Sequence, residues 1–270
     1  MVPAETTMRK LKICVLVFFV ALAGCVTMPE FRDQEIELVV PEHMGPSWSY
    51  GGKNGPKNWG DLTPAWSLAK EGREQSPIDL TGARSSSVLY PLNFAYQSAP
   101  LNLVNNGHTI QQNFTPGSSV EIMGKTYNLA QFHFHSGSEH TVEGRRFDLE
   151  MHLVHKAADG QLLVVGVLFE IGAENPFLAQ FFGQLPASAQ GSIATSGFSL
   201  NPAEALPEDR AYYYYQGSLT TPPCTEGVQW YILRKPMQLS QSQLAAFRAL
   251  YANNYRPTQP LNERTLWETK

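Results

Sequence analysis

The 270-residue sequence predicts a mainly β protein, built as a single domain with a few short helices. Two observations support this prediction. Short stretches that are apolar or alternate in polarity, rich in β-branched and aromatic residues, recur along the chain. The 19 prolines and 21 glycines are spread between them, as expected for many strands joined by turns. A hydrophobic share of 43% with 16% charged residues also indicates a folded globular chain.

Seven stretches have the pattern of strands. Asp159-Gly160, a dipeptide typical of tight hairpins, separates two of them, so these two strands should pair antiparallel. The seven are Leu101–Val104, Thr109–Phe114, Val120–Met123, Tyr127–His135, Phe147–Lys156, Leu162–Glu170 and Val228–Arg234.

Two segments predict helices. The clearer one runs from Ser240 to about Tyr251, because Ser240 and Gln243 have the spacing of a capping box. Its apolar residues share one face, namely Leu244, Phe247 and Tyr251. The second candidate is Pro176–Leu185.

Residues 1–25 predict a signal peptide. A positive start at Arg9, Lys10 and Lys12 precedes the uninterrupted apolar run Ile13–Ala23. The run is too short to span a bilayer, but it suits the apolar core of a signal peptide.

The apolar run ends in Leu22-Ala23-Gly24-Cys25, which resembles the lipobox of bacterial lipoproteins. The resemblance implies that Cys25 is lipidated and anchors the mature chain to a membrane. A plain secretory signal is the alternative, because Ala21-Leu22-Ala23 fits an A-x-A cleavage site. Both interpretations predict an exported protein, periplasmic or on a face of the cell envelope that points away from the cytoplasm.

The rest of the chain divides into a tether and a domain. Residues 26–47 have mixed charge and no clear period, and 48–270 form the predicted domain. Removal of Cys14 and lipidation of Cys25 leave Cys224 alone, so no intrachain disulfide is expected. The net charge of −4 is scattered, which indicates no nucleic-acid partner.

Five of the seven histidines lie between His133 and His155. Side chains alternate along a strand, so His133 and His135 project from one face, and His152 can join them from a neighbouring strand. His155 falls on the opposite face. Three neutral imidazoles with one open position are the arrangement of catalytic zinc sites, so Zn²⁺ is the predicted cofactor.

Two further residues strengthen the zinc prediction. Gln131 and Glu150 each precede a predicted ligand by two residues on the same face, where they can accept its second N–H group. An H-x-H pair alone is more often a surface or core pair. The third histidine and the two acceptors favour a metal site.

Eight motifs resemble the signatures of α-class carbonic anhydrases, of the bacterial secreted or lipoprotein type, and occur in that family's order. They are Asn58-Trp59, Gln75-Ser76-Pro77-Ile78-Asp79, Asn105-Asn106-Gly107-His108, Gln131-Phe132-His133-Phe134-His135, Ser138-Glu139-His140-Thr141-Val142, Glu150-Met151-His152-Leu153-Val154-His155, Gly217-Ser218-Leu219-Thr220-Thr221-Pro222-Pro223 and Arg256-Pro257-Thr258-Gln259-Pro260. The resemblance implies a large twisted, mostly antiparallel central sheet. It also implies reversible hydration of carbon dioxide to bicarbonate by zinc-bound hydroxide, and inhibition by sulfonamides.

The resemblance implies roles for single residues as well. His133, His135 and His152 resemble the zinc ligands, Thr220 and Glu139 the pair that orients the hydroxide, and His108 the proton shuttle. The substrate pocket would have an apolar wall of Val154, Val164, Leu219 and Trp230 and a hydrophilic side of Tyr50, Asn106, Gln111 and Thr221. His140 and Tyr215 resemble buried network residues with a structural role.

Two departures from the family pattern stand out. Many secreted relatives pair the cysteine of the Thr-Pro-Pro-Cys stretch in a disulfide, but the upstream position, near Ala69, holds no cysteine. Ser136 stands where animal relatives carry tryptophan, so altered packing without lost chemistry is expected. The alternative functions are an inactive carbonic anhydrase-like binding module and a surface adhesin or zinc-storage lipoprotein.

Overall fold

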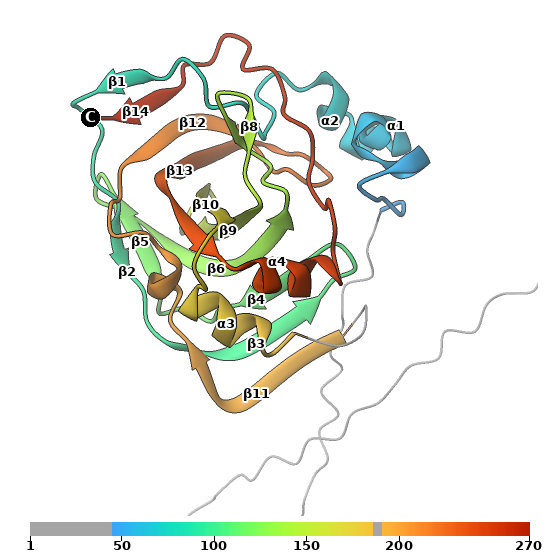
Figure 1. Cartoon of the computed structure of the whole chain (residues 1–270). Helices are drawn as coiled ribbons and strands as arrows, with labels where there is room; N and C mark the ends of the chain where they lie inside the picture. The colour runs from blue at the N-terminus through green and yellow to red at the C-terminus, as the bar shows by residue number, and fades with distance from the viewer. Residues whose placement is uncertain (1–44, 186–190) are drawn as a thin grey trace, which may run out of the picture. The chain divides into compact units, whose positions relative to one another are not determined.

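The computed structural model describes residues 45–185 and 191–270, and the chain from Pro46 to Lys270 forms one compact unit. Within the described residues the fold is a 12-stranded twisted sheet with a few short helices around it (Figure 1). The predicted fold class is therefore confirmed. The predicted signal peptide and nearly all of the predicted tether lie outside the described residues. In the described part, no helix has the length and apolarity needed to cross a membrane.

Ten strands follow one another across the sheet: β1 (Arg84–Ser86), β14 (Trp267–Thr269), β12 (Tyr212–Ser218), β13 (Glu226–Leu239), β10 (Leu162–Ile171), β9 (Leu149–Lys156), β6 (Lys125–Ser136), β4 (Ile110–Asn113), β3 (Ala99–Asn105) and β11 (Gly191–Leu200). Strand β5 (Ser119–Ile122) also pairs with β6, and β2 (Asn93–Ala95) pairs with β5. A separate hairpin consists of β7 (Thr141–Val142) and β8 (Arg145–Arg146).

All seven predicted strands are present, within a few residues of their predicted bounds. The Asp159-Gly160 hairpin joins β9 to β10 antiparallel, with Lys156 opposite Leu162. Most pairings are antiparallel, whereas β10 pairs with β13 and β1 pairs with β14 in parallel. The sheet thus contains a minority of parallel pairs that the sequence pattern does not reveal.

A bulge in β6 sets the direction of its side chains. The pairing of β6 with β9 shifts between Leu129 and Gln131, so that Ala130 is an extra residue. Tyr127 and Leu129 before the bulge, and Phe132 and Phe134 after it, belong to one hydrophobic cluster. Because the alternation changes phase at the bulge, the side chains on the other face after it are Gln131, His133 and His135.

Two hydrophobic clusters enclose the sheet. The larger one contains the β6 phenylalanines and the apolar faces of α3 (Pro176–Phe182) and α4 (Gln241–Arg248), which lie close together in Figure 1. The second contains Val164, Trp230 and Ile232. His133, His135 and His152 lie on the face of the second cluster, since the His152 and Trp230 ring centroids are 4.9 Å apart.

Both predicted helices form. In α4 the Ser240 side chain accepts from the main-chain N–H of Gln243, and the Gln243 side chain accepts from that of Ser240, so the capping box is confirmed. The helix ends at Arg248, three residues before the predicted end. The remaining helices are short: α1 (Trp59–Leu62), α2 (Leu68–Glu71), and the 3₁₀ turns η1 (Gly52–Asn54), η2 (Pro56–Asn58), η3 (Pro64–Trp66) and η4 (Pro202–Ala205).

Candidate metal centre

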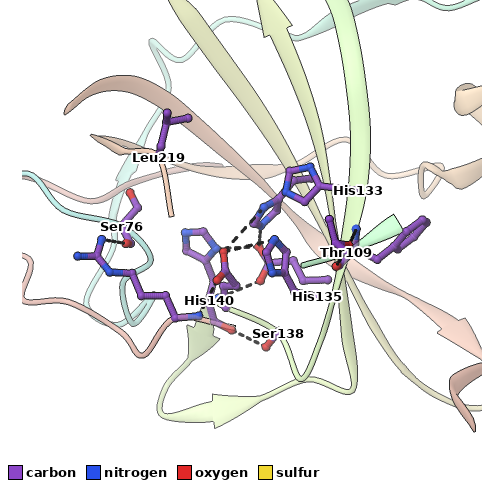
Figure 2. Close-up of polar contacts among 12 residues, drawn as sticks. Ser76, Thr109, His133, His135, Ser138, His140 and Leu219 are labelled. Atoms are coloured by element: carbon purple, nitrogen blue, oxygen red, sulfur yellow. Dashed lines mark hydrogen bonds and ion pairs between the residues drawn. The ribbon is translucent and has the colours of Figure 1, made fainter. Parts of the chain in front are cut away.

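Three histidines of β6 and β9 come together on one face of the sheet. His133 and His152 are directly opposite each other in the β6–β9 pairing, and His135 lies two residues along the strand. One ring nitrogen from each lies within 4.8 Å of the others. His135 and His152 are buried, whereas His133 is only half-buried, so the group opens on the His133 side. Figure 2 shows His133 and His135 projecting from the same strand.

Each of these histidines gives one ring N–H to an acceptor of the protein. The bonds are His133 Nδ1 to Gln131 Oε1 (2.8 Å), His135 Nδ1 to the Asn254 carbonyl (2.7 Å) and His152 Nε2 to Glu150 Oε1 (2.9 Å). A neutral imidazole carries a single N–H, so the second nitrogen keeps a lone pair for a metal. Those nitrogens are Nε2 of His133, Nε2 of His135 and Nδ1 of His152.

Two of these histidines have a lowered pKa, which favours their neutral form. Burial, together with the neighbouring His135 and His152, holds the pKa of His133 well below its usual value. Burial also lowers the pKa of His135. Burial alone would raise the pKa of Glu150, but the neighbouring His140 and His152 outweigh it and hold that pKa well below the usual range. His133 and His135 therefore offer neutral nitrogen donors, and Glu150 supplies a carboxylate beside them.

A second group of possible ligands consists of His140, Glu150 and His152. Its donor atoms already bond to one another, because Glu150 Oε1 accepts from His140 Nδ1 at 2.7 Å and from His152 Nε2 at 2.9 Å. The first group differs, since the buried Nε2 of His135 has no hydrogen-bond partner. A buried polar atom without a partner is costly. The first group is therefore the better metal site.

His140 and Tyr215 continue this network away from the metal site. His140 Nε2 and the Tyr215 hydroxyl are 2.6 Å apart, and Tyr215 donates to Ser76 Oγ at 2.9 Å. Both residues are completely buried. The chain of bonds fixes Glu150, and through Glu150 the ring of His152.

Glu139 lies beside the triad, but without the hydrogen bond expected from Thr220. Its Oε1 accepts from the Arg256 main-chain N–H at 2.7 Å. Its Oε2 has no hydrogen-bond partner and lies 3.6 Å from His135 Nε2. Thr220 is buried at the start of the turn after β12. The free carboxylate oxygen is thus an acceptor available at the centre.

The four residues of the expected apolar wall belong to one cluster. Val164 of β10 is directly opposite Val154 of β9 on one side and Trp230 of β13 on the other. Val154 and Leu219 are partly buried and pack against the same cluster. This row lies on the histidine face of the sheet, because the Trp230 ring contacts the His152 ring.

The polar residues gather around the turn between β3 and β4. Asn106 Oδ1 accepts from the main-chain N–H groups of His108 and Thr109, both at 3.0 Å. The half-buried His108 ring stacks on Trp48, with centroids 3.6 Å apart. Tyr50 lies edge-on to both His108 and His135, at 6.4 and 6.5 Å between centroids. Gln111 pairs with His133 across β4 and β6, and Thr221 is half-buried in the turn after Thr220.

The two departures from the family pattern have simple structural counterparts. Cys224 is a free, buried thiol packed with Trp59 and Ala69, and burial raises its pKa to about 11. Ser136 accepts from Arg248 Nε at 2.9 Å, so a polar contact ties α4 to the histidine strand at this position.

Sequence reasoning missed two residues of the site. Asn254 bonds to His135 through its main-chain carbonyl, and Arg256 bonds to Glu139 through its main-chain N–H. A main-chain contact leaves no mark on the identity of the side chain. Arg256 belongs to the Arg256–Pro260 motif, which suggested no role for it, and Asn254 lies two residues before that motif.

The twisted β-sheet carries a three-histidine candidate metal site beside an apolar wall, and known proteins with related sequences identify the class of enzyme. The chain matches the eukaryotic-type carbonic anhydrase family over residues 54–270. A carbonic anhydrase from Klebsiella pneumoniae is 44% identical over 225 residues, which cover 82% of this chain and 90% of that protein. One from Nostoc sp. is 40% identical over 228 residues, covering 82% and 86%.

The solved structures agree. The α-carbonic anhydrase from Thermovibrio ammonificans, in complex with sulfanilamide, matches with a TM-score of 0.79 at 41% identity, covering 84% of this chain and 100% of that one. The chain belongs to the eukaryotic-type (alpha) carbonic anhydrase family, which confirms the predicted family and class of enzyme.

Proposed function

We propose that this protein hydrates carbon dioxide reversibly to bicarbonate and a proton, with Zn²⁺ held by His133, His135 and His152. The observation that supports this best is the buried His135 Nε2 without a hydrogen-bond partner, beside the two other available ring nitrogens. Neutral imidazole donors suit zinc, and three of them leave one position open. The residues present therefore fit the metal that the family uses.

Glu139 and Thr220 orient the nucleophile. Bound zinc acidifies water to a pKa of about 7, a value known from carbonic anhydrase itself, and so supplies hydroxide at neutral pH. A carboxylate can only accept hydrogen bonds, so a Thr220 hydroxyl that donates to Glu139 must accept from its other neighbour. In a zinc-loaded site that neighbour would be the hydroxide, and the bond from it to Thr220 would aim its lone pair at the carbon of the substrate. The unpartnered Glu139 Oε2 is the acceptor for this chain of bonds.

The apolar wall binds the substrate. Carbon dioxide is small and carries no charge, so it needs apolar contacts and no charged anchor. Val154, Val164 and Trp230 supply a continuous row across three strands, with Leu219 packed against it. Bicarbonate is charged, so it binds more weakly to this apolar wall and is released.

His108 carries the proton away. A group with a pKa of about 7 can lose a proton directly to water only about 10³ times per second, given diffusion-limited recombination. Carbonic anhydrase reaches about 10⁶ per second. An imidazole with a usual pKa near 6.5 closes that gap. His108 is half-buried on the β3–β4 turn, near the polar side of the site.

A stopped-flow assay of carbon dioxide hydration, with and without a zinc chelator, tests the proposed function. Activity should disappear with chelation and return with zinc, and the purified protein should hold one zinc per chain. His152→Ala should lose both zinc and activity, whereas His155→Gln, on the opposite face of the same strand, should keep both. Zinc without hydration would instead favour the inactive binding module.

A sulfonamide such as sulfanilamide, the ligand of the Thermovibrio relative, should inhibit the hydration of carbon dioxide.

We also propose that the protein is exported as a lipoprotein, anchored by lipid on Cys25. The support is the sequence alone: a positive start, a short apolar run and the lipobox-like Leu22–Cys25. The domain would then face away from the cytoplasm, in the periplasm or on the cell envelope.

A further inference from the structure

Asn254 connects two parts of the site that lie far apart in the sequence. Its side-chain Nδ2 donates to the main-chain carbonyls of His108 and Phe134, both at 3.0 Å. Its Oδ1 accepts from the Ser136 main-chain N–H at 2.7 Å. The residue is buried, with 3% of its surface exposed. One amide thus joins the turn that carries His108 to the strand that carries two of the histidine donors.

The bonds of Asn254 bracket His135 on both sides. Phe134 and Ser136 are its neighbours in β6, and the Asn254 carbonyl itself accepts from His135 Nδ1 at 2.7 Å. Thr109, the residue after His108, adds a parallel tie, because its hydroxyl donates to the same Phe134 carbonyl at 2.6 Å (Figure 2). The turn and the strand are therefore held in one arrangement by buried polar contacts.

The chain around Asn254 reinforces this arrangement. Three residues upstream, the Tyr251 hydroxyl donates to Asn105 Oδ1, at the end of β3 and just before the turn that carries His108. Arg248, at the end of α4, donates to Ser136 Oγ. The segment that follows α4 therefore contacts both parts, and the Asn254 side chain bonds to both.

We propose that Asn254 is a positioning residue for proton transfer: it fixes where His108 lies relative to the zinc ligands. The proposal rests on the proposed function, in which His108 shuttles the proton. A displacement of reacting groups by about 1 Å can cost two decades in rate. Loss of the Asn254 hydrogen bonds should therefore slow the proton-transfer step and leave the attack on carbon dioxide almost unchanged.

The test is Asn254→Asp in the full zinc-loaded protein. The aspartate has nearly the same shape and still accepts from Ser136, but in its ionised form it cannot donate to the carbonyls of His108 and Phe134. We expect kcat in dilute non-imidazole buffer to fall about tenfold, while kcat/KM changes less than about twofold. Added imidazole should restore most of the lost kcat. Zinc release to a chelator, a readout independent of activity, should keep its wild-type half-time within about twofold, because the three ligands and their acceptors remain.

Two controls make the outcome decisive. Arg248→Met removes a contact of the same segment to the same strand, and should leave kcat unchanged. In a His108→Ala background, Asn254→Asp should cause no further loss of kcat, because both changes then act on one step. If the aspartate variant does not fold, Asn254→Ser should show the same loss of kcat with imidazole rescue.

Three results would overturn the proposal: wild-type kcat in the Asn254 variants, equal loss of kcat and kcat/KM with faster zinc release, or additive losses in the double variant. Failure of the proposed function has a different signature. The wild-type protein would then lack zinc or hydration activity, or imidazole would not rescue His108→Ala.

Discussion

Each of the three zinc-binding candidates bonds to a different kind of acceptor: a side-chain amide, a main-chain carbonyl and a carboxylate. The bond selects which ring nitrogen carries the proton, and therefore which one faces the metal. For His133 and His135 that nitrogen is Nε2, and for His152 it is Nδ1. At the residue scale, the site is defined by tautomers as much as by residue types.

Replacement of the shuttle candidate gives a prediction at this scale. His108→Ala should lower kcat by about one to three decades, the gap between direct proton loss to water and the family's turnover. Because the nucleophile and the apolar wall are untouched, kcat/KM should change little. Imidazole buffers should restore much of the lost kcat. Stopped-flow kinetics in dilute buffer measure this, and wild-type kcat in the variant would remove His108 from the mechanism.

Thr220→Ala should behave in the opposite way. The attacking hydroxide loses its orientation, so kcat/KM should fall by roughly two decades, the cost of removing one well-placed catalytic hydrogen bond. Imidazole should not help, because proton transfer is intact. The same assay compares the two variants. Rescue of Thr220→Ala by buffer would contradict its proposed role.

At the scale of the element, β9 places two histidines in contrasting environments. His152 faces the metal site, whereas His155 points to the opposite face, where its Nε2 and the Tyr96 hydroxyl are 2.7 Å apart. Burial lowers the pKa of His155 to about 4. A single strand therefore supplies one histidine to the candidate metal site and one to the packing of the opposite face, as the alternation of side chains requires.

The buried His155 gives a pH prediction. An unfolded histidine binds a proton below about pH 6.5, and the folded His155 does so only below about pH 4, so the unfolded state holds more protons between these values. Stability should therefore fall as the pH drops from about 6.5 to about 4, and this group should account for about 3 kcal/mol. Urea unfolding at pH 7 and pH 4 should show a correspondingly smaller pH effect in His155→Gln. An equal effect in both proteins would contradict the assignment.

The elements that the sequence predicts well are those with an unambiguous period. The H-x-H strand, the Asp159-Gly160 hairpin and the Ser240 capping box all rest on local chemistry, and all are present. Strand β12 was missed, because four successive tyrosines show no alternation in polarity, although Tyr212 and Tyr215 are buried and the two between them are half-buried. Short edge strands such as β1 contain too few residues to establish a period.

At the scale of the whole molecule, the site depends on contacts that no local pattern encodes. Histidines of β6 and β9, the β3–β4 turn and the segment after α4 meet across more than a hundred residues of sequence. The grouping of His133, His135 and His152 could be predicted because alternation places them on one face. Asn254 and Arg256 could not, because their bonds use main-chain atoms or depend on tertiary packing.

The cellular location of the protein is a prediction that concerns the whole chain. If Cys25 carries lipid, the wild-type protein should be found in the membrane fraction, and Cys25→Ser should be released to the soluble fraction or remain unprocessed. A lipid on the N-terminal residue of the mature chain is measurable by mass spectrometry. A lipid-free soluble protein after signal removal would rule out the anchor while leaving export intact.

The bulge in β6 limits which changes in the sequence this site can tolerate during evolution. Ala130 has no functional side chain, yet it sets the phase by which His133 and His135 face the metal site and Phe132 and Phe134 face the core. A one-residue change of length exchanges the two faces of a strand. Deletion of Ala130 would therefore turn His133 and His135 toward the hydrophobic cluster that now contains Phe132 and Phe134. A substitution at this position would leave the phase of the strand unchanged. Active relatives are therefore expected to vary in the amino acid at this position but never to lack the residue.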